Sequence, residues 1–202
     1  MQTTKNRLFT SKISKFSNYS AKMVTVIEVE MKLQNLRFIG LAVLLLFSSF
    51  AANAQGDTFS DPNADYTFDL PDTRWKMNAK PSATNPNVEY VFVDRMDGHL
   101  IVRKLVVAKD AILSDVIRDE ESSVQFKQGF VAGREENFSG RLRGSIYNFE
   151  FVSAGRNMAG RYYFLRANDT TVYVLRFHGQ KDTLRSIRAQ TDSIARSFAV
   201  KK

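Results

Sequence analysis

Two neighbouring apolar runs, residues 162–165 and 172–175, constrain the fold more than any other feature of the chain. Their sequences are Tyr-Tyr-Phe-Leu and Val-Tyr-Val-Leu. Successive side chains of a strand point to opposite faces, so a strand that is apolar at every position must be covered on both faces. Asn168 and Asp169 lie between the runs and predict a turn. The two runs therefore predict adjacent strands in a sheet with two covered faces.

Shorter runs that alternate in polarity or are rich in β-branched and aromatic residues predict further strands. These runs lie at residues 66–70, 75–77, 88–93, 100–107 and, with Tyr147, Phe149 and Phe151 on one face, between 130 and 153. Asp97 and Gly98 stand between two of the runs and predict a hairpin turn there. The short connections favour a mainly antiparallel sheet.

Two segments have apolar residues at helical spacing. The first covers residues 112–124, with Asp110 as its expected N-cap, and the second covers residues 184–198, with Asp182 as its expected N-cap. The order is four strands, a helix, three or four strands and a helix. This order, with a sheet apolar on both faces, predicts an α+β fold in which helices cover a mainly antiparallel sheet.

Residues 31–54 have the three parts of a secretory signal peptide in order: a basic stretch, an apolar run of 13 residues, and small residues at Ala52 and Ala54. We expect cleavage after Ala54. The alternative is an uncleaved anchor, but a membrane-spanning helix needs roughly 20 apolar residues. Residues 1–30 are either a long n-region or a non-native upstream extension, with translation beginning at Met31, and we favour the extension.

The mature chain then begins at residue 55, with a flexible lead-in over 55–65 and a single domain over 66–200.

The whole chain carries 29 Lys and Arg against 21 Asp and Glu, a net charge of +8. Residues 1–54 hold seven of these basic residues and two of the acidic ones, so the mature chain has a net charge of only +3. This modest charge, together with export, argues against nucleic acid as a partner. The chain has no Cys, which excludes disulfides and Cys-based metal sites.

Three stretches carry a resemblance to a known family. They are the strand leading through Pro71 to Trp75, the aromatic strand pair at 161–164 and 172–177, and the final helix ending in Ile-Ala-Arg-Ser-Phe at 194–198. The mature chain resembles the PsbP/DcrB/Mog1-like superfamily in these features. The resemblance implies an αβα sandwich around an antiparallel sheet and no catalytic residues. The lipid-bearing Cys of the lipoprotein members is absent here, so we expect no stable membrane anchor after cleavage.

The usual catalytic motifs are missing from the sequence. His99 and His178 are the two histidines, and we interpret both as surface or edge residues, with no metal site and no cofactor. No G-x-S-x-G nucleophile elbow occurs. The glycines at 140 and 144 lack the Lys and Ser/Thr of a P-loop, so this segment is interpreted as a hairpin turn.

One set of polar residues interrupts the apolar strands, and we take it as the candidate ligand site. The set is Asn148, Glu150, Arg166, Arg176 and His178. If their faces coincide, these side chains could line a cleft that binds an anion or a carboxylate, since Arg presents a planar fork to such groups. The alternatives are a structural ion pair, because buried charges need partners, or a solvent-facing stripe.

The sequence therefore predicts a periplasmic or secreted, non-enzymatic accessory or binding domain of the bacterial cell envelope. Its expected partner is a protein or an envelope component. The alternative is a small-molecule or anion-binding module that uses the polar strand residues. A third possibility is an unrecognised hydrolase, which would require a Ser hydroxyl within hydrogen-bonding reach of His99 or His178.

Overall fold

The computed structural model describes residues 56–201. The predicted signal peptide at 31–54, with its cleavage residues Ala52 and Ala54, and the segment 1–30 lie outside the described residues. Export and cleavage therefore stay predictions.

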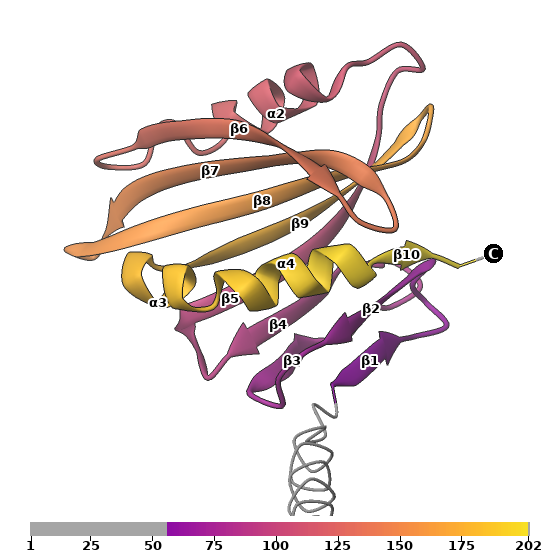
Figure 1. The fold of residues 1–202 in the computed structure, drawn as a ribbon, viewed down its shortest axis with the longest axis horizontal. Helices are drawn as coiled ribbons and strands as arrows, with labels where there is room; N and C mark the ends of the chain where they lie inside the picture. Colours follow the sequence, from indigo (N-terminus) through magenta and orange to yellow (C-terminus); the bar gives the residue numbers. More distant parts are fainter. Residues whose placement is uncertain (1–55, 202) are drawn as a thin grey trace, which may run out of the picture. The chain divides into compact units, whose positions relative to one another are not determined.

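The largest element is a seven-stranded antiparallel sheet (Figure 1). In spatial order its strands are β3 (Trp75–Ala79), β4 (Val88–Phe92), β5 (Asp94–Val106), β9 (Thr171–Gln180), β8 (Arg156–Asn168), β7 (Arg143–Ser153) and β6 (Val131–Ser139). The predicted runs at 162–165 and 172–175 form the middle of β8 and β9, and each of these eight residues is buried. The prediction that this pair is covered on both faces is confirmed.

A second, three-stranded sheet contains β1 (Asp57–Ser60), β2 (Tyr66–Leu70) and β10 (Ala199–Val200), with β2 in the centre. β1 falls in the segment 55–65 that we predicted as a flexible lead-in, and this prediction was wrong for 57–60. β1 pairs with β2 in antiparallel register, and Phe59 is buried against Phe68 with 4.9 Å between ring centroids. Phe59 is the one large apolar residue of a polar segment, too weak a signal for a strand by itself.

Residues 56–201 contain three helices where the sequence predicted two, and their ends differ from the prediction. They are α2 (Leu113–Ser122), α3 (Lys181–Ser186) and α4 (Arg188–Ser197). The predicted N-caps were wrong: α2 begins after Ile112 and α3 after Gln180, without a side-chain cap in either case. Asp182 lies inside the first turn of α3, where its negative charge favours the positive end of the helix dipole. The single predicted C-terminal helix is divided at Ile187.

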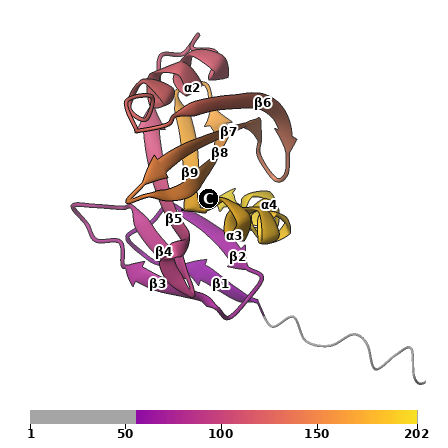
Figure 2. The ribbon, with the colours of Figure 1, turned by 90° about the vertical axis from the view of Figure 1, so that its left-hand side faces the viewer.

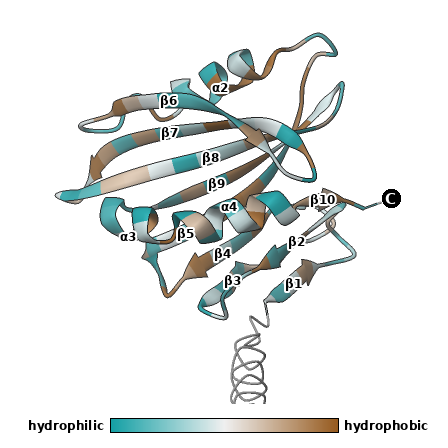
Figure 3. Ribbon diagram, viewed as in Figure 1, coloured by the Kyte–Doolittle hydropathy of each residue, from teal (hydrophilic) through white to brown (hydrophobic). Residues whose placement is uncertain are grey.

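Each face of the seven-stranded sheet has its own core. One face packs Tyr163, Leu165 and Leu175 against the small sheet and against α3 and α4. The other face packs Tyr162 and Phe164 against α2. Figure 2 shows α2 and the α3–α4 segment on different sides of the strands. Hydrophilic and hydrophobic segments alternate along the helices (Figure 3), as expected for helices with one face on a core.

The predicted α+β class with a mainly antiparallel sheet is confirmed. The predicted covering of the sheet by helices is only partly present, because the small sheet covers one face together with α3 and α4. Helical cover of the opposite face comes from α2, through Val116 and Ile117.

Two hairpin turns set the register of the strands. β7 and β8 are joined by Ala154 and Gly155, whose φ angles are +49° and +72°, the conformation of a tight two-residue hairpin. The turn predicted at Asn168 and Asp169 joins β8 to β9. The turn predicted at Asp97 and Gly98 was wrong. The chain reverses at Val93, with φ of +61°, and 97–98 lie within β5 where its register against β4 shifts.

Candidate functional site

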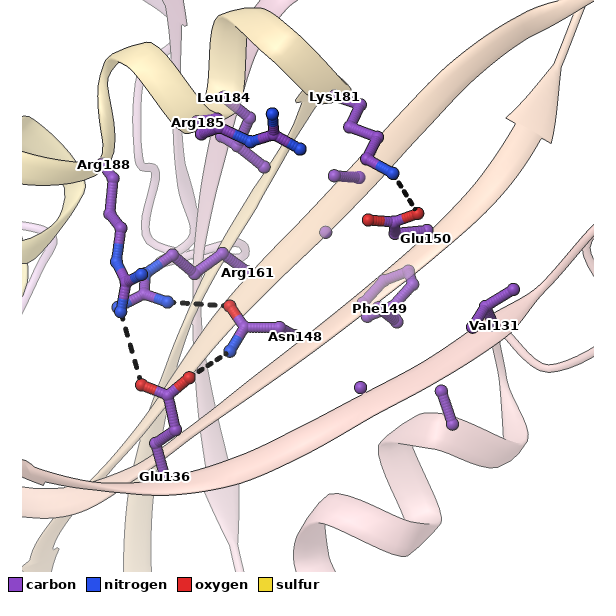
Figure 4. A pocket seen from close by; sticks show the side chains of 14 residues that line it. Val131, Glu136, Asn148, Phe149, Glu150, Arg161, Lys181, Leu184, Arg185 and Arg188 are labelled. Carbon is purple, nitrogen blue, oxygen red and sulfur yellow. Dashed lines mark hydrogen bonds and ion pairs between the residues drawn. The ribbon is translucent and has the colours of Figure 1, made fainter.

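A pocket of about 430 Å³ lies between one face of β6, β7 and β8 and the α3–α4 segment (Figure 4). We call it the α3 pocket. Its charged and polar lining residues are Glu136, Asn148, Glu150, Arg161, Lys181, Arg185 and Arg188. The rest of the lining is apolar or glycine: Val131, Ala132, Gly133, Phe149, Ala159, Gly160 and Leu184. The pocket therefore combines charged side chains with apolar residues and glycines.

Gly160 of β8 lines the α3 pocket and packs closely against a ring on the other face of the sheet. Gly160 lies directly opposite Phe149 in the β7–β8 ladder, and the Phe149 ring covers it from the α2 side of the sheet. A Cβ added at Gly160 would lie 2.2 Å from the Phe149 ring, so no larger residue fits without displacing the ring. Glycine at 160 therefore makes room for the Phe149 ring on the α2 face of the sheet.

Arg161 is the anchored cation of the pocket, with a side chain only 6% exposed. Its Nη1 donates to Asn148 Oδ1 at 2.7 Å, and its Nη2 donates to Asp192 Oδ1 of α4 at 2.8 Å. Its Nε donates to the Tyr163 hydroxyl at 2.7 Å. The guanidinium is therefore held by one partner at each nitrogen, as a buried charge requires.

The pKa values of this network reflect mutual stabilisation of opposite charges. Burial alone would lower the pKa of Arg161, but the neighbouring Tyr163 and Asp192 raise it. Burial alone would raise the pKa of Asp192, but hydrogen bonds from Tyr163 and Arg161 lower it. Arg161 and Asp192 therefore form an ion pair that tethers α4 to β8.

The rim of the pocket carries three further cations from the α3–α4 segment. Lys181 Nζ donates to Glu150 Oε2 at 2.7 Å, and Arg188 Nη2 lies 3.4 Å from Glu136 Oε2. Arg185 makes no contact with either of these carboxylates; its ion-pair partner in the described chain is Asp182, 3.8 Å away with both side chains largely exposed. Such an exposed pair contributes little, so Arg185 presents an available cation at the pocket mouth.

The five sequence-predicted residues divide between the two faces of the sheet. Asn148 and Glu150 line the α3 pocket. Arg166, Arg176 and His178 have the opposite parity on their strands, so they lie on the face covered by α2. The five side chains therefore do not converge on one cleft. A ligand-binding role stays a prediction for Asn148 and Glu150.

On the α2 face the predicted arginines are held by protein groups. Arg166 Nη2 donates to the Ala111 carbonyl oxygen at 2.5 Å. Arg176 donates to Glu120 of α2, and its guanidinium lies 5.5 Å from the centre of the Tyr162 ring. Burial and the nearby Arg103 lower the pKa of Arg176 to about 10. Arg176 is therefore part of a structural ion pair with Glu120, which was the alternative to a ligand-binding role.

Both histidines lie on central strands of the sheet, opposite one another in the β5–β9 ladder. His99 is buried and its Nε2 lies 3.1 Å from Glu89 Oε2. His178 Nε2 lies 2.5 Å from the Tyr162 hydroxyl. The interpretation of the histidines as surface or edge residues was wrong, because both lie on central strands, where His99 is buried and His178 is half-buried. Their hydrogen-bond partners are Glu89 and Tyr162, with no serine among them in the described residues.

His178 should make the stability of the protein depend on pH. Burial, with the positive charges of Lys127, His99 and Arg176, lowers the pKa of His178 to about 3 from a usual value of 6.5. Between these values the unfolded chain binds a proton that the folded protein does not, so stability is complete above the unfolded pKa and falls as pH falls. From about pH 7 to about pH 5 the His178 contribution should fall by about 1–2 kcal/mol.

Urea unfolding of the wild type and His178→Gln at both pH values measures this effect. The variant should lose less stability on acidification, because glutamine keeps a hydrogen-bonding group near Tyr162 and does not titrate. Equal losses in the two proteins would show that His178 titrates normally in the folded state.

Two further observations concern residues 56–201. No group of three or more His, Asp or Glu side chains in this range is placed to hold a metal ion. None of its helices has the length and apolar character needed to span a bilayer.

Five charged lining residues were missed as site residues by the sequence prediction: Glu136, Arg161, Lys181, Arg185 and Arg188. Arg161 lies in the predicted aromatic strand pair, and Arg185 and Arg188 lie in the predicted C-terminal helix, but no binding role was predicted for them. A signal was present: Lys181, Leu184, Arg185 and Arg188 recur at helical spacing, which places them on one side of a continuous helix. The buried Leu184 indicates that this side faces the sheet.

Comparison with solved structures identifies the architecture. The solution structure of cyanobacterial PsbP (CyanoP) from Synechocystis sp. PCC 6803 matches 72% of this chain and 92% of that chain, with a TM-score of 0.53 and 15% identity. The fold is PsbP-like. A crystal structure from Bacteroides thetaiotaomicron matches with a TM-score of 0.53 and 13% identity, over 73% of this chain and 49% of that chain. This chain thus spans about half the length of the Bacteroides protein.

A third solved structure, LpqN of Mycobacterium tuberculosis, described as involved in cell envelope biogenesis, has a TM-score of 0.49 and 15% identity over 73% of this chain and 92% of that chain. At such identities the PsbP-like likeness concerns the fold alone. No family model matches the chain, and no curated protein matches it. The superfamily resemblance inferred from the sequence is thereby confirmed at the level of the fold.

Proposed function

We propose that this chain is an exported, non-enzymatic binding domain of the bacterial cell envelope, and that the α3 pocket is its binding site. Export rests on the signal-peptide pattern at 31–54, which would release the folded part into the periplasm or the medium. A non-enzymatic role is supported by the histidines, because His99 and His178 form hydrogen bonds with Glu89 and Tyr162. The PsbP-like fold agrees with an accessory domain.

The observation that carries the proposal is a contrast within the pocket: the cation at its floor is held in place by protein groups, whereas the cations at its rim are exposed to solvent. Arg161 is immobilised by Asn148, Tyr163 and Asp192, while Arg185 and Arg188 reach the pocket mouth with more than half of each side chain exposed. A preorganised floor lowers the cost of ordering side chains on binding. Exposed guanidinium groups supply forks for carboxylate or phosphate groups.

A second candidate is a small-molecule or anion-binding module that takes a free ligand into the same pocket. The lining by Asn148 and Glu150 favours it, because these residues offer neutral and acidic groups beside the basic rim. The two candidates differ in whether the ligand is attached to the envelope.

Charge reversal at Arg188 tests the first candidate. Purified envelope fragments of the expressing bacterium are mixed with the protein recovered from cells expressing the full chain, and the sedimented fraction is measured. Arg188→Glu should reduce the bound fraction several-fold, because it places a carboxylate beside Glu136 at the rim.

Arg118→Glu on α2 is the matched control. Arg118, like Arg188, is an exposed helical arginine with one carboxylate partner, Asp115 at 3.0 Å. This variant should sediment like the wild type. Equal loss in both variants would indicate attraction by overall charge, and a wild type that stays in the supernatant would contradict the envelope proposal.

A further inference from the structure

The α3 pocket adjoins a second hollow of about 510 Å³ that is lined by residues from the start of β8, the end of β9 and α3. Lys181 and Arg185 line both hollows. Arg156 and Asn157 of the β7–β8 hairpin lie on the far side of the second hollow. Lys181 and Arg185 therefore stand at the boundary between two adjoining depressions of the same surface.

The charges of the combined surface leave cations in excess. Arg161 is already neutralised by Asp192, which lines neither hollow. Of the four remaining cations, Lys181 and Arg188 face Glu150 and Glu136 across the α3 pocket. Arg156 makes no ion pair with any residue in the range 56–201, and Arg185 has only the exposed Asp182, 3.8 Å away, which is the carboxylate that lines the second hollow. The unused cations thus lie at the boundary and in the second hollow.

We infer that the two hollows form one groove for a linear ligand that carries two or more carboxylate or phosphate groups, with Arg185 binding between them. This inference rests on the proposed function and specifies its ligand. Arg188 follows Lys181 by seven positions, so the α3 side of the groove extends over ~10 Å before Arg156 is reached. A ligand with a single anionic group is too short to use both ends.

Length dependence is the property that distinguishes a groove from a single pocket. Isothermal titration calorimetry of the protein with galacturonate and with trigalacturonate provides the carboxylate arm, and a short-chain polyphosphate compared with inorganic phosphate provides the phosphate arm. In at least one arm, the longer ligand should bind about tenfold more tightly than its monomer, because its second group binds at a high effective concentration. The arm with the larger ratio identifies the anionic group.

Arg185→Glu should remove this length dependence and weaken binding of the longer ligand about tenfold, while Arg118→Glu should bind like the wild type. Monomers that bind as tightly as the longer ligands, or an Arg185→Glu variant that keeps the length dependence, would overturn the groove. Either result leaves the proposed function standing if Arg188→Glu still reduces envelope binding several-fold. Failure of envelope binding with length dependence intact would instead refute the proposed function and keep the groove.

Discussion

Asp192→Ala should lower the free energy of unfolding by about 3 kcal/mol, because it removes the carboxylate partner of a buried guanidinium. Asp192 accepts hydrogen bonds from Arg161 and Tyr163 of β8. Without this carboxylate, the positive charge of Arg161 stays in the interior with no opposite charge. The loss should also weaken the attachment of α4 to the sheet, and equilibrium unfolding in urea measures the change in stability.

Two companion variants separate charge from hydrogen bonding. Asp192→Asn keeps an oxygen acceptor and should lose less stability than Asp192→Ala. Asp182→Ala removes a carboxylate that is 94% exposed on the adjoining helix and should leave stability unchanged. If Asp192→Ala unfolded at the wild-type urea concentration, Arg161 would not depend on Asp192 and our description of the pocket floor would be incorrect.

Phe198→Ala should destabilise the protein by about 3–5 kcal/mol, since it removes a fully buried aromatic ring and leaves a cavity. Phe198 follows α4, and its ring centre lies 5.1 Å from that of Tyr173 and 5.3 Å from that of Tyr66. It therefore joins the large sheet to the small one. Thermal or urea unfolding should show the shift in a single transition.

Phe126→Ala is the matched control, because Phe126 is 86% exposed in the segment after α2. Its removal should not lower stability. Similar losses for Phe126→Ala and Phe198→Ala would contradict the core that the structure describes.

The strands of the large sheet could be predicted because their side chains follow the two-residue period of a half-buried or buried strand. Residues 162–165 and 172–175 were predicted instead from short runs that are apolar at every position. β1 could not be predicted in this way, because its stability comes from pairing with β2 and from one ring, Phe59, which are tertiary interactions. The division of the C-terminal helix at Ile187 could not be predicted either, because no proline or glycine marks it in the sequence.

The candidate site was predicted only in part. The sequence shows which residues of one strand share a face, but it does not show how neighbouring strands are aligned. Asn148 and Glu150 share a face by alternation alone. Their relation to Arg176 depends on how β7, β8 and β9 are aligned. The two-residue turn at Ala154 and Gly155 would have supplied the first alignment, because it pairs Ser153 with Arg156 and hence Asn148 with Arg161.

The account rests on the α3 pocket as the binding surface, and hydrogen exchange tests this claim most directly. Amide exchange of the protein is compared with and without purified envelope fragments. We predict slower exchange at β6 and α3, which line the pocket, and unchanged exchange at α2 on the opposite face of the sheet. Protection of α2 with unchanged exchange at β6 and α3 would contradict the account.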